Sequence, residues 1–348
     1  MDIDWSQVKR ILIVKLRSIG DTVLLTPSIT ALRRFLPNAE IDVLLEDWVA
    51  PVVDGFPGIS VITVGKTFGS RVSAAWQLRR RKYDIAFDQH GGNTASLLAR
   101  ASGARHRIGY DDYNYAFCFN HLVPRDTSFW GQKKLHSAER QLALLGAVGV
   151  PVDEAPRSSL AVSARASDEI DRRLAASGLP DAQSSIALIH PAAAFATKQW
   201  SAANFARTAE FLVSKGISIV AVATRHEQKV LDDLKRGSGV PIATFAGLSL
   251  PEITALASKA RIFVGNDSGI AHIAAAVGTP SVVIFGSSSR ETWYPWTDAP
   301  NEIVFSEFPC QPCPGYTCEV FGTPKCILSV TIDQVSAAVN RVLLASQH

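Results

Sequence analysis

Short apolar runs alternate along the chain with stretches in which apolar residues recur every three or four positions. The short runs are typical of buried strands, and the periodic stretches are typical of helices packed on a sheet. Regular alternation of the two predicts a mostly parallel α/β sheet in each half of the chain. Strands are expected at 11–14, 41–45, 59–64, 85–87, 107–109, 186–189, 217–223, 244–247, 262–264 and 281–285, and helices at 22–35, 74–81, 94–101, 135–148, 166–176, 204–215, 227–235, from 251, at 270–277 and at 331–345.

Two segments interrupt this alternation. Residues 110–134 are rich in aromatic and polar side chains without a clean period, so we expect a long irregular loop there. Residues 149–166 contain Pro151 and Pro156 and are typical of a crossover between domains. A chain of 348 residues is also too long for one typical core. The sequence therefore predicts two Rossmann-like domains, 1–160 and 161–330, followed by a terminal helix within 331–348.

The stretch 261–286 holds the clearest candidate binding site. Its pattern predicts a strand, a tight polar turn, an Ala-rich helix and a second strand, which together form a βαβ unit. Asp267, Ser268 and Gly269 stand at the start of the helix, where free backbone N–H groups and the helix dipole favour a phosphate. His272 lies one turn further on. The alternative is that Asp267 only caps the helix and that His272 is a core histidine.

The segment after the first strand carries a second candidate. It contains neither a Gly-x-Gly-x-x-Gly fingerprint nor a Walker sequence, which argues against dinucleotide oxidoreduction and NTP hydrolysis. Asp21 instead stands near the start of the next helix, where its carboxylate can accept a proton from an incoming hydroxyl. Favourable interaction with the helix dipole is an equally simple reason for an acid at this position.

Charge and composition exclude several classes of protein. The formal net charge is +3, from 35 basic and 32 acidic residues, which gives no electrostatic case for nucleic-acid binding. The basic run at 79–82 is either a solvated helix end or a contact with an anionic lipid surface. Apolar stretches are interrupted by polar residues, and the first sixteen residues lack a secretory pattern, so we expect a cytoplasmic protein without a membrane span.

Four of the five cysteines fall in one Pro- and Gly-rich segment, 310–326. In a cytoplasmic chain such a cluster suggests a tetrahedral structural zinc, although the spacing is not that of paired knuckles. Reduced thiols or a disulfide pair are the alternatives. The candidate ligands are Cys310, Cys313, Cys318 and Cys326.

Three motifs together carry a resemblance to a known family. Ser18-Ile19-Gly20-Asp21, Lys198-x-Trp200 and Asp267-Ser268-Gly269-x-x-His272 follow one another as they do in glycosyltransferase family 9, the ADP-heptose–lipopolysaccharide heptosyltransferases. The resemblance runs from about residue 11 to about residue 335. It implies the GT-B fold, two Rossmann-like domains facing across a crevice. The first would bind the acceptor and the second the nucleotide sugar, and the terminal helix would pack back on the first.

The resemblance also implies a reaction. Heptose would pass from ADP-heptose to a sugar hydroxyl of the lipopolysaccharide inner core with inversion, Asp21 would be the general base, and Lys198 would stabilise the leaving diphosphate. The chemistry requires no redox cofactor, and whether a divalent ion assists stays open. Because the acceptor is a lipid, peripheral contact with the cytoplasmic face of the inner membrane is expected. The implied donor-binding residues are Ala193, Ala194, Lys198, Glu227, Leu248, Asp267, Ser268, Gly269 and His272, and position in the fold suggests Ser18, Gly20, Asp88, His90 and Asn93 for the acceptor.

The sequence departs from the family pattern at several of these positions. Ala193 and Ala194 replace hydroxyl side chains that relatives often carry near the phosphates, and the usual Gly-Pro before Glu227 is missing. Three other functions are therefore kept open: a transferase of the same fold that uses a UDP- or GDP-sugar, a non-catalytic nucleotide- or glycan-binding protein, and, more distantly, an NAD-dependent dehydrogenase.

Overall fold

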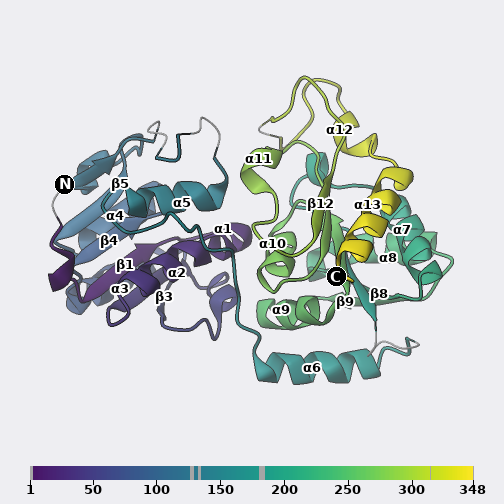
Figure 1. Cartoon of the computed structure of the whole chain (residues 1–348), viewed down its shortest axis with the longest axis horizontal. Coiled ribbons are helices and arrows are strands. Elements are labelled where there is room, and N and C mark those ends of the chain that lie inside the picture. Colours follow the sequence, from purple (N-terminus) through teal and green to yellow (C-terminus); the bar gives the residue numbers. More distant parts are fainter. Residues whose placement is uncertain (1–2, 126–128, 132–134, 180–184, 314, 348) are drawn as a thin grey trace. The chain divides into compact units, whose positions relative to one another are not determined.

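The computed structural model describes all residues except 1–2, 126–128, 132–134, 180–184, 314 and 348. The chain divides into two compact units, Met1–Ser158 and Ser159–His348. Each unit is an α/β layer structure in which helices flank a central sheet (Figure 1).

In the described part of the first unit, six strands form one parallel sheet in the order β3-β2-β1-β4-β5-β6. This is the Rossmann strand order, in which the sheet runs outward in both directions from its first strand. The strands are β1 (Arg10–Val14), β2 (Glu40–Glu46), β3 (Ser60–Val64), β4 (Ile85–Asp88), β5 (His106–Tyr110) and β6 (His121–Val123), and the helices are α1 (Ile19–Val23), α2 (Thr26–Phe35), α3 (Phe68–Arg81), α4 (Asn93–Ala101) and α5 (Ser137–Gly146).

The second unit repeats this topology. Its described strands form a parallel six-stranded sheet in the order β12-β11-β10-β7-β8-β9, which is the same Rossmann order read from the other edge. The strands are β7 (Ile186–His190), β8 (Ser218–Ala223), β9 (Ile242–Ala246), β10 (Ile262–Asn266), β11 (Ser281–Ile284) and β12 (Asn301–Val304), and the helices are α6 (Ala164–Ala175), α7 (Ala202–Ser214), α8 (Gln228–Gly237), α9 (Leu250–Lys259), α10 (Gly269–Ala276), α11 (Arg290–Trp293), α12 (Lys325–Leu328) and α13 (Ile332–Ala345).

Continuous apolar strands explain why both sheets are covered on two faces. Ile11, Leu12 and Ile13 of β1 are fully buried in succession, so neighbouring side chains on opposite faces both lack contact with water. The same holds for β7, whose five residues are all buried. Strands of this kind need helices on both sides, which is the arrangement of doubly wound folds.

The terminal helix takes part in the core of the second unit. Its buried residues Val335, Ala338, Val339 and Val342 belong to that hydrophobic core, where α13 contacts α7, β11 and β12. The expected packing of this helix on the first domain stays a prediction.

Three further differences from the sequence expectation concern local structure. The helix expected at 22–35 is two helices, and Pro27 lies in the first turn of the second one, where its missing N–H costs least. The helix expected at 74–81 begins earlier, at Phe68, where the Thr67 side chain caps it. The short strands β6 and β12 lie in segments for which we expected no strand.

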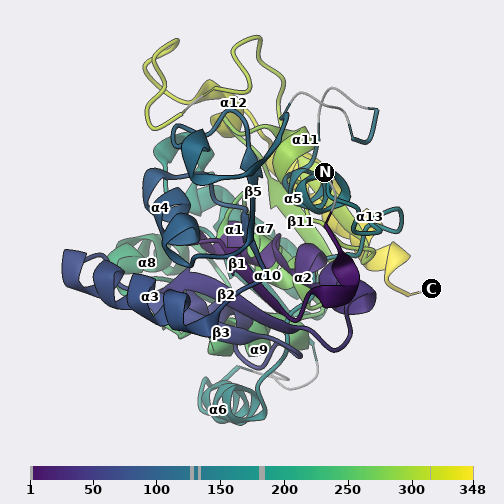
Figure 2. The same ribbon diagram turned by 90° about the vertical axis from the view of Figure 1, so that its left-hand side faces the viewer.

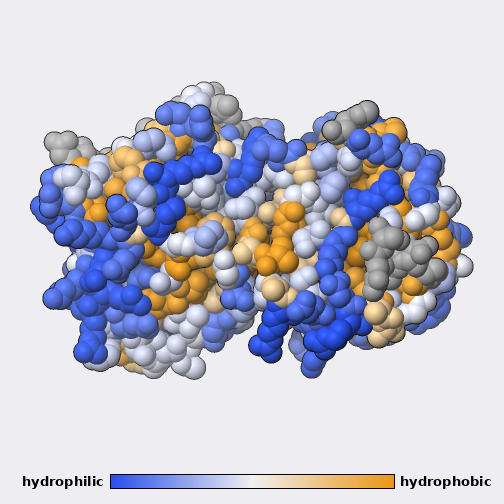
Figure 3. Space-filling model, turned by 60° about the horizontal axis from the view of Figure 1, so that its bottom comes forward, coloured by the Kyte–Doolittle hydropathy of each residue, from blue (hydrophilic) through white to orange (hydrophobic). Residues whose placement is uncertain are grey.

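Figure 3 shows hydrophilic residues over much of one face of the molecule, with hydrophobic patches between them. In the part of the chain that the structure describes, no helix combines the length and the apolar character that a membrane crossing requires.

Candidate active site

Each sheet has one point at which the strand order reverses, between β1 and β4 in the first unit and between β7 and β10 in the second. The chain leaves these neighbouring strands toward opposite flanks, which opens a crevice at their carboxyl ends where ligands bind in such folds. Most of the residues expected from the sequence to act on a substrate follow these four strands.

In the first unit, Asp21 lies on α1 and is held by two neighbours. Its carboxylate forms an ion pair with Lys15 at 3.0 Å, and the Ser18 hydroxyl donates a hydrogen bond to it at 2.9 Å. Lys15 is buried directly after β1, and its Nζ also donates to the Gln89 carbonyl at 2.9 Å. Lys15 therefore ties the loop after β1 to the loop after β4 and fixes the Asp21 carboxylate between them.

The surroundings of Asp21 keep it ionised. Burial raises the pKa of the Asp21 carboxyl, but the Lys15 charge and the hydrogen bonds from Lys15 and Ser18 outweigh burial. The pKa is thus lower than that of an ordinary aspartate. At neutral pH the group is an acceptor of protons and hydrogen bonds.

Asp88 ends β4 and organises the loop that follows. Its buried carboxylate accepts hydrogen bonds from the His90 and Gly91 amides, both at 2.9 Å, and from the Ser96 hydroxyl at 3.0 Å. Burial raises its pKa to about 6, although these donors oppose the shift. Gly91 has a positive φ of 81°, and an added Cβ would meet the Tyr113 ring at 2.4 Å, so the turn requires glycine. Asp88 therefore shapes the loop that presents His90.

The remaining acceptor candidates lie around the same point. His90 is half-buried, and burial together with the Lys15 charge lowers its pKa, while the nearby Asp21 charge raises it. The imidazole is therefore neutral at pH 7 and lies within electrostatic range of the catalytic candidate. Gly20 is buried within α1, Ser18 is exposed at its start, and Asn93 is exposed at the start of α4.

In the second unit, Asn266 ends β10 and fixes the loop after β7. Its side chain accepts a hydrogen bond from the Trp200 amide at 3.0 Å and donates to the Pro191 carbonyl at 2.9 Å. Trp200 is fully buried and its indole N–H donates to the Val330 carbonyl at 2.9 Å. These bonds fix both ends of the loop 191–200, which carries Lys198.

The Lys198 side chain reaches the residues that precede α10. Lys198 belongs to a short 3-10 turn, Ala196–Lys198, and its Nζ pairs with the Asp267 carboxylate at 2.8 Å. The Ser288 hydroxyl donates to the same carboxylate oxygen. The Thr197 carbonyl lies 2.1 Å from where a Cβ on Gly286 would stand, so only glycine allows this approach of the two loops. Lys198 and Asp267 are thereby brought together from loops after different strands.

The first turn of α10 keeps the character of an anion site. Ser268 is the N-cap residue, but its side chain does not cap the helix and its hydroxyl instead lies 3.2 Å from His190 Nδ1. Burial lowers the His190 pKa to about 4, so this ring is neutral at pH 7. His272 is buried one turn further on. Backbone N–H groups of a first helical turn have no partner within the helix, and the Lys198 ammonium pairs with Asp267 directly before this turn.

The other donor candidates lie nearby or at the ends of β8 and β9. Glu227 accepts hydrogen bonds from the Thr224 amide at 3.0 Å and hydroxyl at 2.7 Å, which makes it part of a capping box, and its charge reaches His190. Leu248 is half-buried after β9. Ala194 is exposed, and the Ala193 amide donates to the Gln199 side chain at 3.3 Å.

The four clustered cysteines are free thiols. Cys326 is buried and the other three are half-buried. Burial raises the pKa values of Cys313 and Cys326, and the neighbouring thiols add to the shift. Among the described residues, no group of three or more His, Cys, Asp or Glu side chains is arranged to hold a metal ion. The thiols lie near enough to one another to affect each other's pKa, and a structural zinc at this segment stays a prediction.

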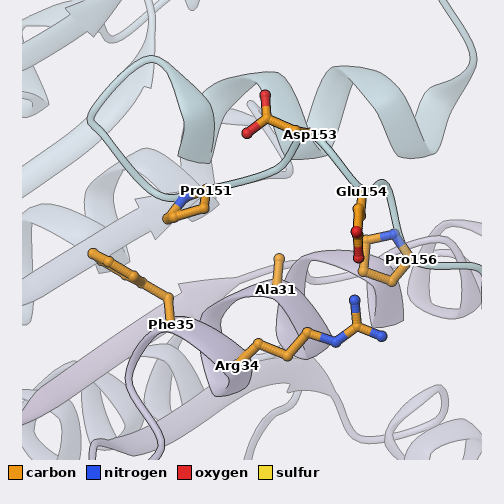
Figure 4. Close-up of a pocket in the computed structure, with 7 residues that line it drawn as sticks. All are labelled: Ala31, Arg34, Phe35, Pro151, Asp153, Glu154 and Pro156. Atoms are coloured by element: carbon orange, nitrogen blue, oxygen red, sulfur yellow. The ribbon is translucent and has the colours of Figure 1, made fainter.

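A pocket of about 450 Å³ in the first unit is separate from this chemistry. Figure 4 shows the seven residues around it, which come from α2 and from the segment 151–156. None of the candidate site residues lines it. Its charged groups are one arginine and two acids, and its lining residues are Ala31, Arg34, Phe35, Pro151, Asp153, Glu154 and Pro156.

Sequence reasoning missed four residues of the two switch points: Lys15, His190, Asn266 and Ser288. Lys15 and His190 are polar residues at the ends of apolar strand runs, and Asn266 is the last residue of its strand. A polar side chain at the carboxyl end of a buried strand is thus the signal that would have found three of them. Ser288 follows β11 in a polar run without such a signal.

Two Rossmann-like units, each with polar residues at its switch point, are the architecture of GT-B glycosyltransferases, and that is the class of enzyme that fold and site define here. Comparison with known proteins identifies the family within this class. Residues 71–322 match the family model described as glycosyltransferase family 9 (heptosyltransferase). The chain belongs to this family, as the three sequence motifs predicted.

Individual relatives agree with this assignment. The chain is 29% identical to lipopolysaccharide heptosyltransferase 3 of Escherichia coli K12, over 82% of this chain and 84% of that protein. Among solved structures, a family 9 glycosyltransferase from Veillonella parvula superposes with a TM-score of 0.85 at 20% identity, covering 99% of both chains. The E. coli heptosyltransferase WaaC with ADP gives 0.71 at 18% identity, covering 97% of this chain and 99% of that one. The predicted α/β two-domain GT-B fold is confirmed.

Proposed function

We propose that this glycosyltransferase moves heptose from ADP-heptose to a sugar hydroxyl of the lipopolysaccharide inner core, with inversion at the anomeric carbon. The observation that carries the proposal is that each unit has one charged centre at its switch point, an ionised Asp21 held by Lys15 in the first and a Lys198 ammonium paired with Asp267 before α10 in the second. One centre suits an acceptor hydroxyl and the other a leaving diphosphate. Family membership and the names of the relatives support the choice of sugar and acceptor.

Asp21 acts as the general base. Its carboxylate takes the proton of the acceptor hydroxyl while that oxygen bonds to the anomeric carbon of the donor. A carboxylate with a lowered pKa is a weaker base but is fully ionised at neutral pH. His90, which is neutral and close by, and the Ser18 hydroxyl offer hydrogen bonds to the acceptor sugar. Asp88 acts through the loop that it organises, and Gly20 and Asn93 line the same region.

Lys198 and the first turn of α10 receive the leaving group. As the bond from the anomeric carbon to the diphosphate oxygen breaks, the electron pair passes to the diphosphate, whose charge the ammonium and the Ser268 and Gly269 amides stabilise. Asp267 holds Lys198 in place before the donor binds. The buried His272 packs under the same turn.

The adenosine moiety lies toward the ends of β8 and β9. Glu227 has one carboxylate oxygen in its capping box and offers the other to the ribose hydroxyls, and Leu248 packs on the adenine. Ala193 and Ala194 contribute backbone groups only, because methyl side chains cannot hydrogen-bond a phosphate. The displacement consumes no cofactor, and the clustered cysteines take no part in it.

The acceptor also sets where the enzyme works. A lipopolysaccharide core is anchored by its lipid, so the protein meets its substrate at a membrane surface. We place it at the cytoplasmic face of the inner membrane as a peripheral enzyme.

The test is an Asp21→Asn variant measured for both transfer and binding. We expect the rate of heptose transfer to fall by about a hundredfold or more, because the amide cannot accept the proton. Calorimetric titration should show ADP binding unchanged, since Asp21 takes no part in the donor site. Asp54→Asn, an exposed acid of the same unit, is the matched control and should keep full activity.

Titration of the wild type with ADP, UDP, GDP and NAD separates the alternatives. Selective ADP binding that is lost in Lys198→Ala supports the proposal. Preference for UDP or GDP would retain the fold and replace the donor. Full transfer activity in Asp21→Asn would show that another group is the base, and no nucleotide binding at all would favour a glycan-binding protein.

A further inference from the structure

Helix α3 of the first unit has an unusual distribution of exposed residues. Of its fourteen residues only Ala74 and Leu78 are buried. Phe68, Val72 and Trp76, in contrast, are 83%, 52% and 63% exposed. Their spacing of four residues places them in a row along one side of the helix, and that side points away from the buried pair. Three large apolar side chains in a row on a solvent-facing side are not explained by packing within the unit.

The charges on the segment that carries this row are all positive. Residues 66–82 contain six basic side chains and no acidic one. Arg80 lies over the Trp76 ring at 4.2 Å. Arg81 forms an ion pair within the first unit, with the buried Asp42 at 3.7 Å. For Lys66, Arg71 and Arg80, the described residues supply no ion-pair partner. The six basic residues are Lys66, Arg71, Arg79, Arg80, Arg81 and Lys82.

The position of α3 leaves this side accessible. Its main contacts are with α4 and with β3, the edge strand of the first sheet. Figure 2 shows α3 on the outside of the first unit, lying along β2 and β3. A helix at such an edge can lie flat on a surface without disturbing the core.

We propose that α3 is the membrane-docking surface of the protein and that it lies in the interface of an anionic bilayer. Phe68, Val72 and Trp76 enter the boundary between headgroups and acyl chains, while the surrounding lysines and arginines bind lipid phosphates. An exposed aromatic row with basic flanks is the pattern of interfacial helices, and their binding grows with buried apolar area and with the anionic charge of the lipid. The absence of any acid between 66 and 82 is the charge complementarity that selects an anionic surface. The inference rests on the proposed function only for the identity of the membrane.

Sedimentation with lipid vesicles tests this without donor or acceptor. Wild-type protein should bind vesicles of phosphatidylcholine and phosphatidylglycerol, bind pure phosphatidylcholine weakly, and lose binding as salt is raised. Phe68→Ser/Trp76→Ser should lower the partition coefficient by about tenfold or more, because it removes the apolar area that enters the bilayer. Arg71→Glu/Arg80→Glu should lower it by about tenfold or more as well, since each basic residue near the surface contributes about fivefold. Tryptophan fluorescence should shift to shorter wavelength on binding, and because the chain has seven tryptophans, loss of the shift in Trp76→Phe assigns it to Trp76.

Two control variants carry equivalent substitutions in helices other than α3. Leu344→Ser removes an apolar side chain that is 62% exposed in α13, and Arg165→Glu/Lys235→Glu makes the same charge change on exposed positions of α6 and α8. Both should bind vesicles as the wild type does. Equal loss in the controls, unchanged binding in the α3 variants, or no binding by the wild type would each overturn the proposal, the last in favour of a protein partner for this surface.

Activity measurements separate this inference from the proposed function. The α3 variants should transfer heptose normally to a soluble, delipidated core acceptor and more slowly to the lipid-bearing one. Vesicle binding with no heptose transfer to either acceptor would refute the function and leave the docking surface intact.

Discussion

The Lys15–Asp21 pair shows where reasoning from single residues reaches its limit. A carboxylate after the first strand is visible in the sequence as a candidate base, and the structure places it at the switch point as expected. Its partner, Lys15, precedes it by six residues at the end of an apolar strand. Lys15 was not identified from the sequence as a site residue. The pairing depends on how the chain turns after β1, and apolar periodicity carries no information about that turn.

The pair makes a prediction about pH. In Lys15→Met the Asp21 carboxylate keeps its burial, which raises the pKa, and loses the charge and hydrogen bond that lower it. Because the base must be ionised, activity is lost as pH falls through this pKa. The acid limb of kcat/KM should therefore move to higher pH, while activity on the alkaline plateau stays measurable. A pH–rate profile checks this, and an unmoved acid limb would assign it to a different group.

Among elements, ten of the twelve described strands lie where they were expected, whereas the short helices α11 and α12 were not expected and α3 begins earlier than expected. Apolar runs such as those of β1 and β7 clearly predict buried strands. In contrast, β6 and β12 are short and partly exposed, so their residues show no clear strand pattern. The first turn of α3 was missed for a different reason. Its apolar residues face solvent, so they do not share the period of the buried pair Ala74 and Leu78.

The loop that presents Lys198 depends on a contact with Gly286 that no sequence pattern reveals. Gly286→Ala would place a methyl group against the Thr197 carbonyl, and overpacking of this kind costs about 1–3 kcal/mol. We expect a lower Tm and an ADP affinity reduced together with it, because the turn Ala196–Lys198 must shift. Thermal unfolding and calorimetry measure the two effects.

Gly237→Ala is the matched control, because its added Cβ would meet only ordinary contacts at 3.5 Å near the end of α8. It should change neither Tm nor ADP affinity appreciably. If Gly286→Ala behaved in the same way, the loop would have room that the structure does not show.

For the molecule as a whole, each unit has its own sheet, its own core and its own switch point. The sequence predicted this division from strand–helix alternation and from the prolines at 151 and 156. Which elements of the second unit α13 contacts could not be predicted in the same way, because an amphipathic pattern shows which side of a helix is buried but not which element covers it.

This division predicts that residues 159–348 fold alone and bind ADP. Affinity within about threefold of the full chain is expected, since the proposed donor contacts all lie in this unit. Heptose transfer should be absent, because Asp21 is missing. Circular dichroism and titration of the expressed fragment check both points, and an unfolded fragment would show that the units depend on each other.

The identical strand order of the two sheets also bears on how such enzymes diversify. The protein is a repeated framework with two different sets of loops, one carrying the proposed base and the other the proposed phosphate site. Substitutions in the loops after β1 and β4 can change which sugar is accepted and leave the nucleotide site untouched. A lineage of these proteins can thus lengthen an oligosaccharide one unit at a time by altering only half of an inherited scaffold.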